Sequence, residues 1–218
     1  MIDKQAILDA FHFRHACKAF DPQRKISADD FAFILETGRL SPSSFGYEPW
    51  RFVVIQDMAL REKLLPVTWG AQGQFPTASH VVAILARGED MRPGSAYVEH
   101  MMRDIQKLPD EAVARRRTFY QQFHEVDFEL QDPRCLFEWS ARQTYLALAN
   151  MMTAAAMLGI DSCPIEGFNR KDAEAVLDAA GLLDDGRFGL SVMAAFGYRA
   201  KPQPEKKRQP LDDIVRWV

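Results

Sequence analysis

Apolar residues recur at helical spacing near the start of the chain, and this pattern predicts two helices. The first spans residues 4–13 and places Arg14 at its C-terminal edge. The second runs from Ser27 to Arg39, with an apolar stripe along one face. A serine hydroxyl accepts hydrogen bonds from first-turn amides, and Asp30 stands where a capping box has its acid. Ser27 is therefore predicted to cap this helix.

Short runs of β-branched and apolar residues predict strands at 52–56, 81–86 and 188–196. Polar turns bound these runs, and their continuous hydrophobicity is typical of strands covered on both faces. A helix over 59–65 separates the first two. The last residues, 214–218, are predicted to add an edge strand.

The segment 139–158 is apolar almost all round, which predicts a helix buried on several sides, in a domain centre or against a partner subunit. Gly159 is predicted to end it. The longest apolar run, 144–160, contains Asn150 and Thr153 and is slightly short for a bilayer span. We therefore expect no membrane association.

Charged residues dominate from about residue 88 to residue 137, which predicts a helical excursion with solvated faces. The basic triplet 115–117 is interpreted as part of such a face. Phe119, Tyr120 and Phe123 follow at near-helical spacing, and residues of this kind more often pack than bind ligands.

The composition indicates one domain over residues 1–218, because 218 residues with 47% hydrophobic content can fill one core. A net charge of −3 and a pI near 6.0 argue against nucleic acid as a partner. The three cysteines cannot form a disulfide framework, and the start of the chain does not resemble a secretory signal, so we expect a cytoplasmic protein. His12 and His15 lack further ligands for a metal.

Four separated segments offer groups suited to a flat, phosphorylated ligand. They are Arg14–Lys18, the loop Ser41–Trp50, Pro164–Phe168 and Lys206–Arg208. The loop combines hydroxyl residues with glycine and proline, and the other segments supply cations or a close-approaching backbone. No GxGxxG motif follows a strand, so a Rossmann nicotinamide site is not expected.

Taken in order and spacing, these segments resemble the FMN-dependent nitroreductase family over nearly the whole chain. The likeness is carried by Arg14–Asp21, Ser41–Trp50, Ala78–Val82, Pro164–Phe168 and Lys206–Pro210. It implies an α+β fold with a central mixed, mostly antiparallel sheet flanked by helices, in an intertwined homodimer. The branch it resembles is that of oxygen-insensitive NAD(P)H nitroreductases and dihydropteridine reductases, with FMN as cofactor and NADH or NADPH as reductant.

Residue chemistry assigns distinct tasks within this resemblance. Arg14 and Arg208 can present planar charged forks to the FMN phosphate, with Lys206 as a point charge beside them. Lys18 is expected at N1 and C2=O of the ring, where a cation raises the reduction potential. Arg14 and Lys18 could instead be a solvated pair on an exposed turn.

Main-chain groups are expected at the reactive edge of the ring. The resemblance implies that the amides of Glu166 and Gly167 contact flavin N5, so no side chain is assigned a catalytic role. Taken by itself, the segment Pro164–Gly167 could also be a simple turn between a strand and a helix. The full set of residues expected at the cofactor is Arg14, His15, Ala16, Lys18, Ser41, Pro42, Ser43, Ser44, Gly46, Ala71, Gln74, Pro164, Ile165, Glu166, Gly167, Lys206 and Arg208.

The family resemblance also implies that residues 41–44 reach the flavin of a neighbouring subunit and that the excursion walls the active-site channel, lined by Phe45 and Tyr120. The chain departs from the family pattern at four positions, Ala16, Gly46, Glu48 and Ala71. At Ala71 the neighbouring Gln72 could compensate, and Gln74 keeps a polar partner for the ring.

The expected reaction is hydride transfer from NAD(P)H through flavin N5 to nitroaromatic, quinone or related acceptors, in a ping-pong sequence over one face of the ring. Two alternatives stay open. One is a flavin-binding protein without turnover, and the other is a dehalogenating or flavin-cleaving branch of the same fold.

Overall fold

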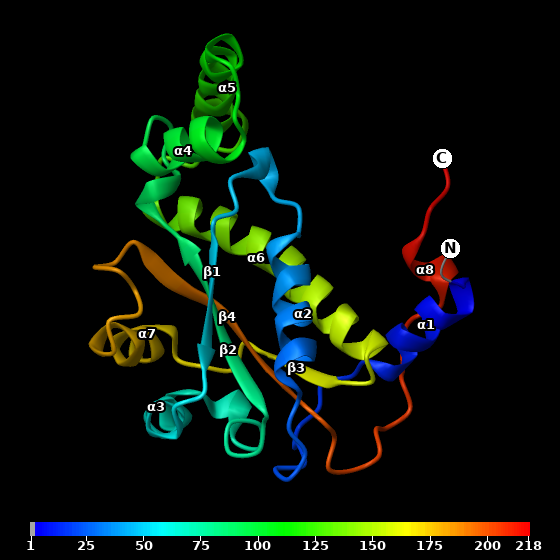
Figure 1. Cartoon of the computed structure of the whole chain (residues 1–218). Helices are drawn as coiled ribbons and strands as arrows, with labels where there is room; N and C mark the ends of the chain where they lie inside the picture. Colours follow the sequence, from blue (N-terminus) through cyan, green and yellow to red (C-terminus); the bar gives the residue numbers. More distant parts are fainter. Residues whose placement is uncertain (1–2) are drawn as a thin grey trace.

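The computed structural model describes residues 3–218 and has a four-stranded sheet at its centre (Figure 1). In spatial order the strands are β1 (Trp50–Ile55), β2 (His80–Arg87), β4 (Phe188–Gly197) and β3 (Asp161–Ile165). Every adjacent pair is antiparallel, and one isolated parallel bridge joins Ala16 to Ser162. The expected α+β architecture is confirmed, with a sheet that is antiparallel throughout its named strands.

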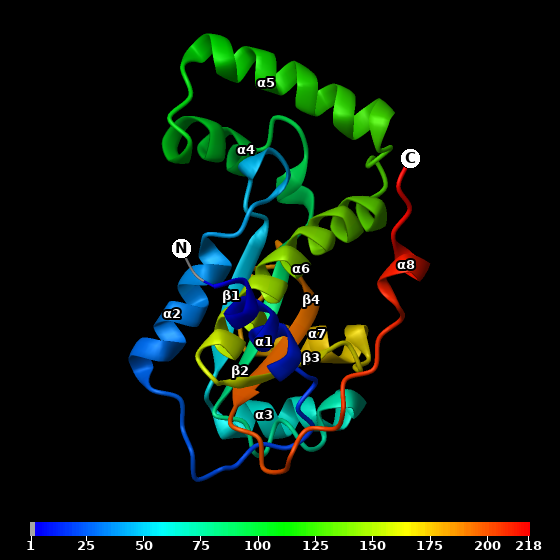
Figure 2. The ribbon, with the colours of Figure 1, turned by 90° about the vertical axis from the view of Figure 1, so that its right-hand side faces the viewer.

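Helices cover both faces of this sheet. The α-helices of the described chain are α1 (Lys4–Phe13), α2 (Ala28–Arg39), α3 (Met58–Leu64), α4 (Ala96–His100), α5 (Asp110–Gln122), α6 (Pro133–Met157), α7 (Arg170–Ala179) and α8 (Leu211–Ile214). Helices α2 and α6 lie on one side of the sheet, and α3 and α7 on the other (Figure 1). Helices α4 and α5 project beyond one end of the sheet (Figures 1 and 2).

The alternation of side chains along β2 divides the hydrophobic core into two layers. Val82 and Ile84 pack with residues of α2 and α6, whereas Val81 and Ala83 pack with residues of α3 and α7. The edge strand β1 is only half-buried over residues 50–54, so the expectation that it is covered on both faces is not met within this chain.

Local signals placed the early helices correctly. Helices α1 and α2 have the expected bounds, and Ser27 Oγ accepts from the Asp30 amide at 3.1 Å. Helix α6 begins earlier than expected, at Pro133, because Asp132 caps it and a proline at the first helical position lacks only an N–H that would be unpaired there. Within residues 3–218, no helix combines the length and the apolarity that crossing a bilayer requires.

The predicted strands missed one edge strand, β3, and included one at 214–218 that does not form. The run 161–165 forms β3 although it contains Pro164, which is tolerated because β3 is an edge strand. The predicted strand at 214–218 is wrong, since the tail forms the short helix α8 and then has no regular structure. Pro210 followed by Asp212 and Asp213 favours a helix start, because acids stabilise the N-terminal end of a helix.

His80, at the start of β2, gives the fold a testable pH dependence. Its ring stacks on Phe31 with centroids 3.7 Å apart, and its Nδ1 lies 3.0 Å from Ser79 Oγ. Burial, together with the charges of Arg61 and Lys25, lowers the pKa of His80 to about 4 from 6.5. Above the higher value the imidazole is neutral in both the folded and unfolded states, but between the two values only the unfolded chain takes the proton.

We therefore expect the free energy of unfolding to fall by about 1–2 kcal/mol from this residue as the pH drops from 7 to 4.5, after allowance for solvent screening. Urea unfolding at both pH values measures the change. His80→Phe keeps the stacked ring and removes the titrating group, so this variant should lose less stability than the wild type. Equal losses in the two proteins would contradict the assignment.

Candidate functional site

A basic pocket of about 770 Å³ lies between the segment after α1 and the C-terminal tail. Its charged lining consists of Arg14, Lys18, Lys201, Lys206, Lys207 and Arg208, with Glu205 as the one acid. None of these seven side chains forms an ion pair with another residue in the described part of the chain. An excess of unpaired cations around one hollow is the arrangement that a polyanionic ligand requires.

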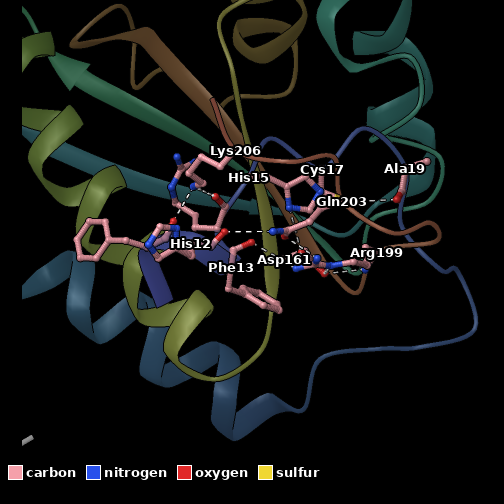
Figure 3. A network of polar contacts seen from close by, with 11 residues as sticks. His12, Phe13, His15, Cys17, Ala19, Asp161, Arg199, Gln203 and Lys206 are labelled. Carbon is pink, nitrogen blue, oxygen red and sulfur yellow. Dashed lines mark hydrogen bonds and ion pairs between the residues drawn. The ribbon is translucent and has the colours of Figure 1, made fainter. Parts of the chain in front are cut away.

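The tail is held in place because its side chains satisfy the carbonyls that end α1. The last carbonyls of a helix receive no hydrogen bond from within the helix, because no further turn supplies the N–H donors. Here Lys206 Nζ donates to the carbonyl of Phe11 at 2.5 Å and to that of Arg14. Gln203 Nε2 donates to the carbonyl of His12 at 3.1 Å (Figure 3). Two residues far along the chain thus close the end of the first helix, and one of them, Lys206, also lines the pocket.

An ion pair between the buried Asp161 and the partly exposed Arg199 anchors the start of the same tail to the sheet (Figure 3). Asp161 of β3 is 3% exposed, and its carboxylate accepts from Arg199 through the backbone N–H at 2.8 Å and through Nε at 3.0 Å. The Arg199 guanidinium also lies 4.2 Å from the centre of the Phe13 ring. Arg199 therefore connects β3, the end of α1 and the tail.

His15 and Lys206 titrate abnormally because of this crowding. The pKa of His15 is lowered by burial and then by the charge of Arg199, with Asp161 opposing from 3.5 Å. The pKa of Lys206 is lowered by burial and then by the charges of Arg14 and Arg208. The repulsion among the last three cations would be relieved by a bound anion, which fits a phosphate group.

A second part of the site adjoins Lys18. Lys18 Nζ lies 3.9 Å from Cys163 Sγ, and Gln74 Nε2 lies 3.4 Å from the same sulfur. Gln74 is 2% exposed, so its amide is buried beside this sulfur. Gln72 points elsewhere, donating to the carbonyls of Leu65 and Thr68, and does not replace a polar group at the buried Ala71.

The turn after β3 presents its backbone at close range. Gly70 donates to the carbonyl of Gly167 at 2.7 Å, and a Cβ on Gly167 would lie 2.7 Å from Gly70 Cα, so only glycine fits there. Among residues 3–218, neither Glu166 nor Gly167 donates its own N–H to a protein acceptor. Tyr145 of α6 donates to the Glu166 carboxylate, which fixes the turn against that helix. Two amides are thus held in place and remain available to a ligand.

The loop at residues 41–46 lies outside this pocket. Ser41 is buried, donating to the Thr37 carbonyl at 2.9 Å and accepting from Asn150 at 2.8 Å. The amide of Ser44 donates to Gln143 Oε1 at 2.9 Å. Ser41, Pro42, Ser43, Ser44 and Gly46 are therefore not brought to the other expected cofactor residues within one chain.

The excursion holds the far end of that loop. Phe45 has φ of 58°, and its carbonyl accepts from Gln106 at 3.0 Å and from Arg116 at 3.1 Å. Arg116 is thus a loop contact, whereas sequence reasoning assigned the basic triplet to a solvated face. Tyr120 is 1% exposed within the core of the excursion and donates to the Met91 carbonyl, a packing position rather than one at a channel mouth.

The pocket brings together six of the residues predicted at the cofactor, Arg14, His15, Ala16, Lys18, Lys206 and Arg208. Pro164 and the buried Ile165 end β3, which carries the Glu166 turn. Sequence reasoning missed Asp161, Arg199 and Cys163. Only their contacts with residues distant in sequence distinguish them, and no local motif marks them.

A second hollow, of about 820 Å³, lies between α7, the start of α6 and the turn before β4. Its charges are balanced, because Arg134, Arg170 and Lys171 share the lining with Glu174, Asp178 and Asp185, and Arg170 pairs with Glu174 at 3.1 Å. It therefore lacks the excess of positive charge that distinguishes the basic pocket.

Comparison with known proteins agrees with this architecture. The model of the nitroreductase family matches residues 12–198. The chain is 50% identical to "Putative NAD(P)H nitroreductase YfkO" of Bacillus subtilis, over 99% of this chain and 98% of that protein. It is 53% identical to a protein of the same description from Staphylococcus aureus, over 98% of this chain and 96% of that one. The protein belongs to the nitroreductase family.

Solved structures share the fold at lower sequence identity. A nitroreductase-type structure from Bacillus subtilis superposes with a TM-score of 0.81 at 19% identity, covering 99% of this chain and all of that one. A structure from Exiguobacterium sibiricum, described as a complex with FMN, gives a TM-score of 0.77 at 24% identity, covering all of this chain and 98% of that one.

Proposed function

We propose that this protein is an FMN-dependent oxidoreductase that takes hydride from NADH or NADPH and delivers it to nitroaromatic, quinone or related acceptors in a ping-pong sequence. The observation that carries the proposal is the unpaired cation cluster of Arg14, Lys206 and Arg208, within a pocket that extends to Lys18. Two further findings support it. The relatives carry the name NAD(P)H nitroreductase, and one structural neighbour is described as a complex with FMN.

The residues of the chain fit distinct parts of FMN. Arg14, Lys206 and Arg208 would hold the phosphate, and Lys18 would place a positive charge at the pyrimidine edge of the ring. The free amides of Glu166 and Gly167 would orient the opposite edge. Bound FMN supplies the atom that accepts and then donates hydride, so the protein binds and orients the ring and shields it from water.

We also propose that the active unit is a homodimer. Ser41–Ser44 lie outside the basic pocket of their own chain, which is consistent with a role at the site of a second copy. Exposed apolar side chains, including Leu8 and Phe11 of α1 and Leu146 of α6, offer surface for such a contact. In this proposal the wall of the active-site channel is formed by the helical excursion, about residues 88–137, which contacts Phe45. Sedimentation should give a dimer mass, and a fully active monomer would contradict this arrangement.

The three free cysteines suit a reducing cytoplasm as the site of action. Small aromatic or quinone acceptors are the proposed partners of the site, beside the second copy.

The test is spectroscopic. Protein loaded with FMN should be yellow, should bleach on anaerobic addition of NADH or NADPH, and should regain its colour with a nitroaromatic or quinone. Protein that binds no FMN would overturn the proposal. Colour that persists with both reductants would indicate flavin binding without turnover, and loss of flavin or release of halide from a halogenated acceptor would indicate the other branches of the fold.

A further inference from the structure

Two segments distant in sequence converge on the sulfur of Cys163, one carrying Lys18 and the other Gln74. The thiol lies on β3 and is fully buried. Its S–H points to the Pro164 carbonyl at 3.5 Å, while Gln74 Nε2 and Lys18 Nζ approach the sulfur at 3.4 Å and 3.9 Å. The thiol therefore donates once and accepts from two side chains, which matches its modest hydrogen-bonding capacity.

The backbone around the thiol is held by close contacts, and the Lys18 ammonium adds a single contact to the sulfur. Cys17 donates to the Ser162 carbonyl at 3.1 Å, which ties the Lys18 segment to β3. A Cβ on Gly73 would lie 2.3 Å from the Lys18 carbonyl, so the loop that carries Gln74 packs tightly against the same segment. Within residues 3–218, the ammonium of Lys18 has no partner other than this sulfur.

We propose that Cys163 is a positioning residue that orients the Lys18 ammonium and the Gln74 amide toward the ligand. This inference rests on the proposed function, which places both groups at the flavin ring. A free lysine side chain samples many rotamers, and fixing it before binding removes part of that entropy cost. Sulfur is a weak, uncharged acceptor, so it directs the ammonium without cancelling its charge, as a carboxylate at this position would.

The experiment compares Cys163→Val, which keeps the volume and removes the polar group, with Cys163→Ser, which keeps a donor and an acceptor. Each is made in the wild type and in a Lys18→Met/Gln74→Leu background. Titration of flavin-free protein should show that Cys163→Val binds FMN about 5-fold more weakly than the wild type, and that Cys163→Ser stays within about 2-fold. In the Lys18→Met/Gln74→Leu background, Cys163→Val should cause no additional loss.

The potential of bound flavin provides a readout that general damage to packing would not move in the same selective way. Cys163→Val should lower it in the wild type and leave it unchanged in the double-variant background. Cys135→Val, at an exposed thiol of α6, is the control and should match the wild type. An equal loss of FMN affinity in both backgrounds, or none in either, would overturn the proposal.

Failure of the proposed function is distinguishable from failure of this inference. If the wild type takes up no FMN, the function is refuted, and the coupling between Cys163 and its two partners is then read from urea unfolding of the flavin-free variants. Unfolding free energies that add independently would refute the positioning role, whereas a favourable coupling would support it.

Discussion

Arg14→Ala is expected to bind FMN about 30-fold more weakly than the wild type, because a charge-assisted contact to phosphate contributes about 2 kcal/mol. Arg14 lines the basic pocket and forms no ion pair within residues 3–218, so its guanidinium is available to an anion. Fluorescence titration of flavin-free protein with FMN measures the loss.

Two comparisons make this result specific. Riboflavin lacks the phosphate, so its weaker binding should change little in Arg14→Ala. Lys4→Ala removes a positive charge from the exposed first turn of α1, away from the pocket, and should bind FMN as the wild type does. Equal losses for FMN and riboflavin would place Arg14 away from the phosphate.

Asp161→Asn is expected to lower the free energy of unfolding by about 3 kcal/mol, because it removes the buried carboxylate charge that accepts two hydrogen bonds from Arg199, whose side chain is 22% exposed. The corresponding drop in Tm is about 6–10 °C for a domain of this size. Asp161 is 3% exposed and receives hydrogen bonds from the Arg199 backbone and guanidinium. Thermal unfolding of flavin-free protein measures the effect.

The same change should loosen the tail and weaken FMN binding, since Arg199 anchors the segment that brings Lys206 to the end of α1. Faster proteolysis near residue 200 would report the loosening. Arg199→Met added to Asp161→Asn should recover part of the lost stability by removing the unpaired charge. Asp178→Asn, at an exposed acid of α7, is the control. Strict additivity of the Asp161 and Arg199 changes would contradict a coupled pair.

The departures from the family pattern acquire different meanings in the structure. Gly46 has φ of 66°, and a Cβ there would lie 3.1 Å from the Gln106 amide nitrogen, so glycine suits this tight contact. Glu48 has φ of 45°, and its carbonyl accepts from Tyr97. Both positions are shaped by the excursion as well as by any ligand.

The sequence alone determined the elements whose signals lie within a few residues of one another. The capping of α2 by Ser27 and the bounds of α1 follow from neighbouring side chains and amides, so they were predictable. The cations of the basic pocket could also be named in advance, because the residue types that bind phosphate are few. These features depend on local chemistry.

Only the tertiary structure decided which of these groups meet. Lys206 donates to the carbonyls at the end of α1, and Arg199 pairs with Asp161. The Lys18 ammonium contacts the sulfur of Cys163, which lies 145 residues further along the chain. Such contacts depend on the path of the whole chain over the sheet, and no periodicity or motif encodes that path locally. The same reason explains the wrong strand at 214–218, because an apolar run becomes an edge strand only where the fold leaves an edge within its reach.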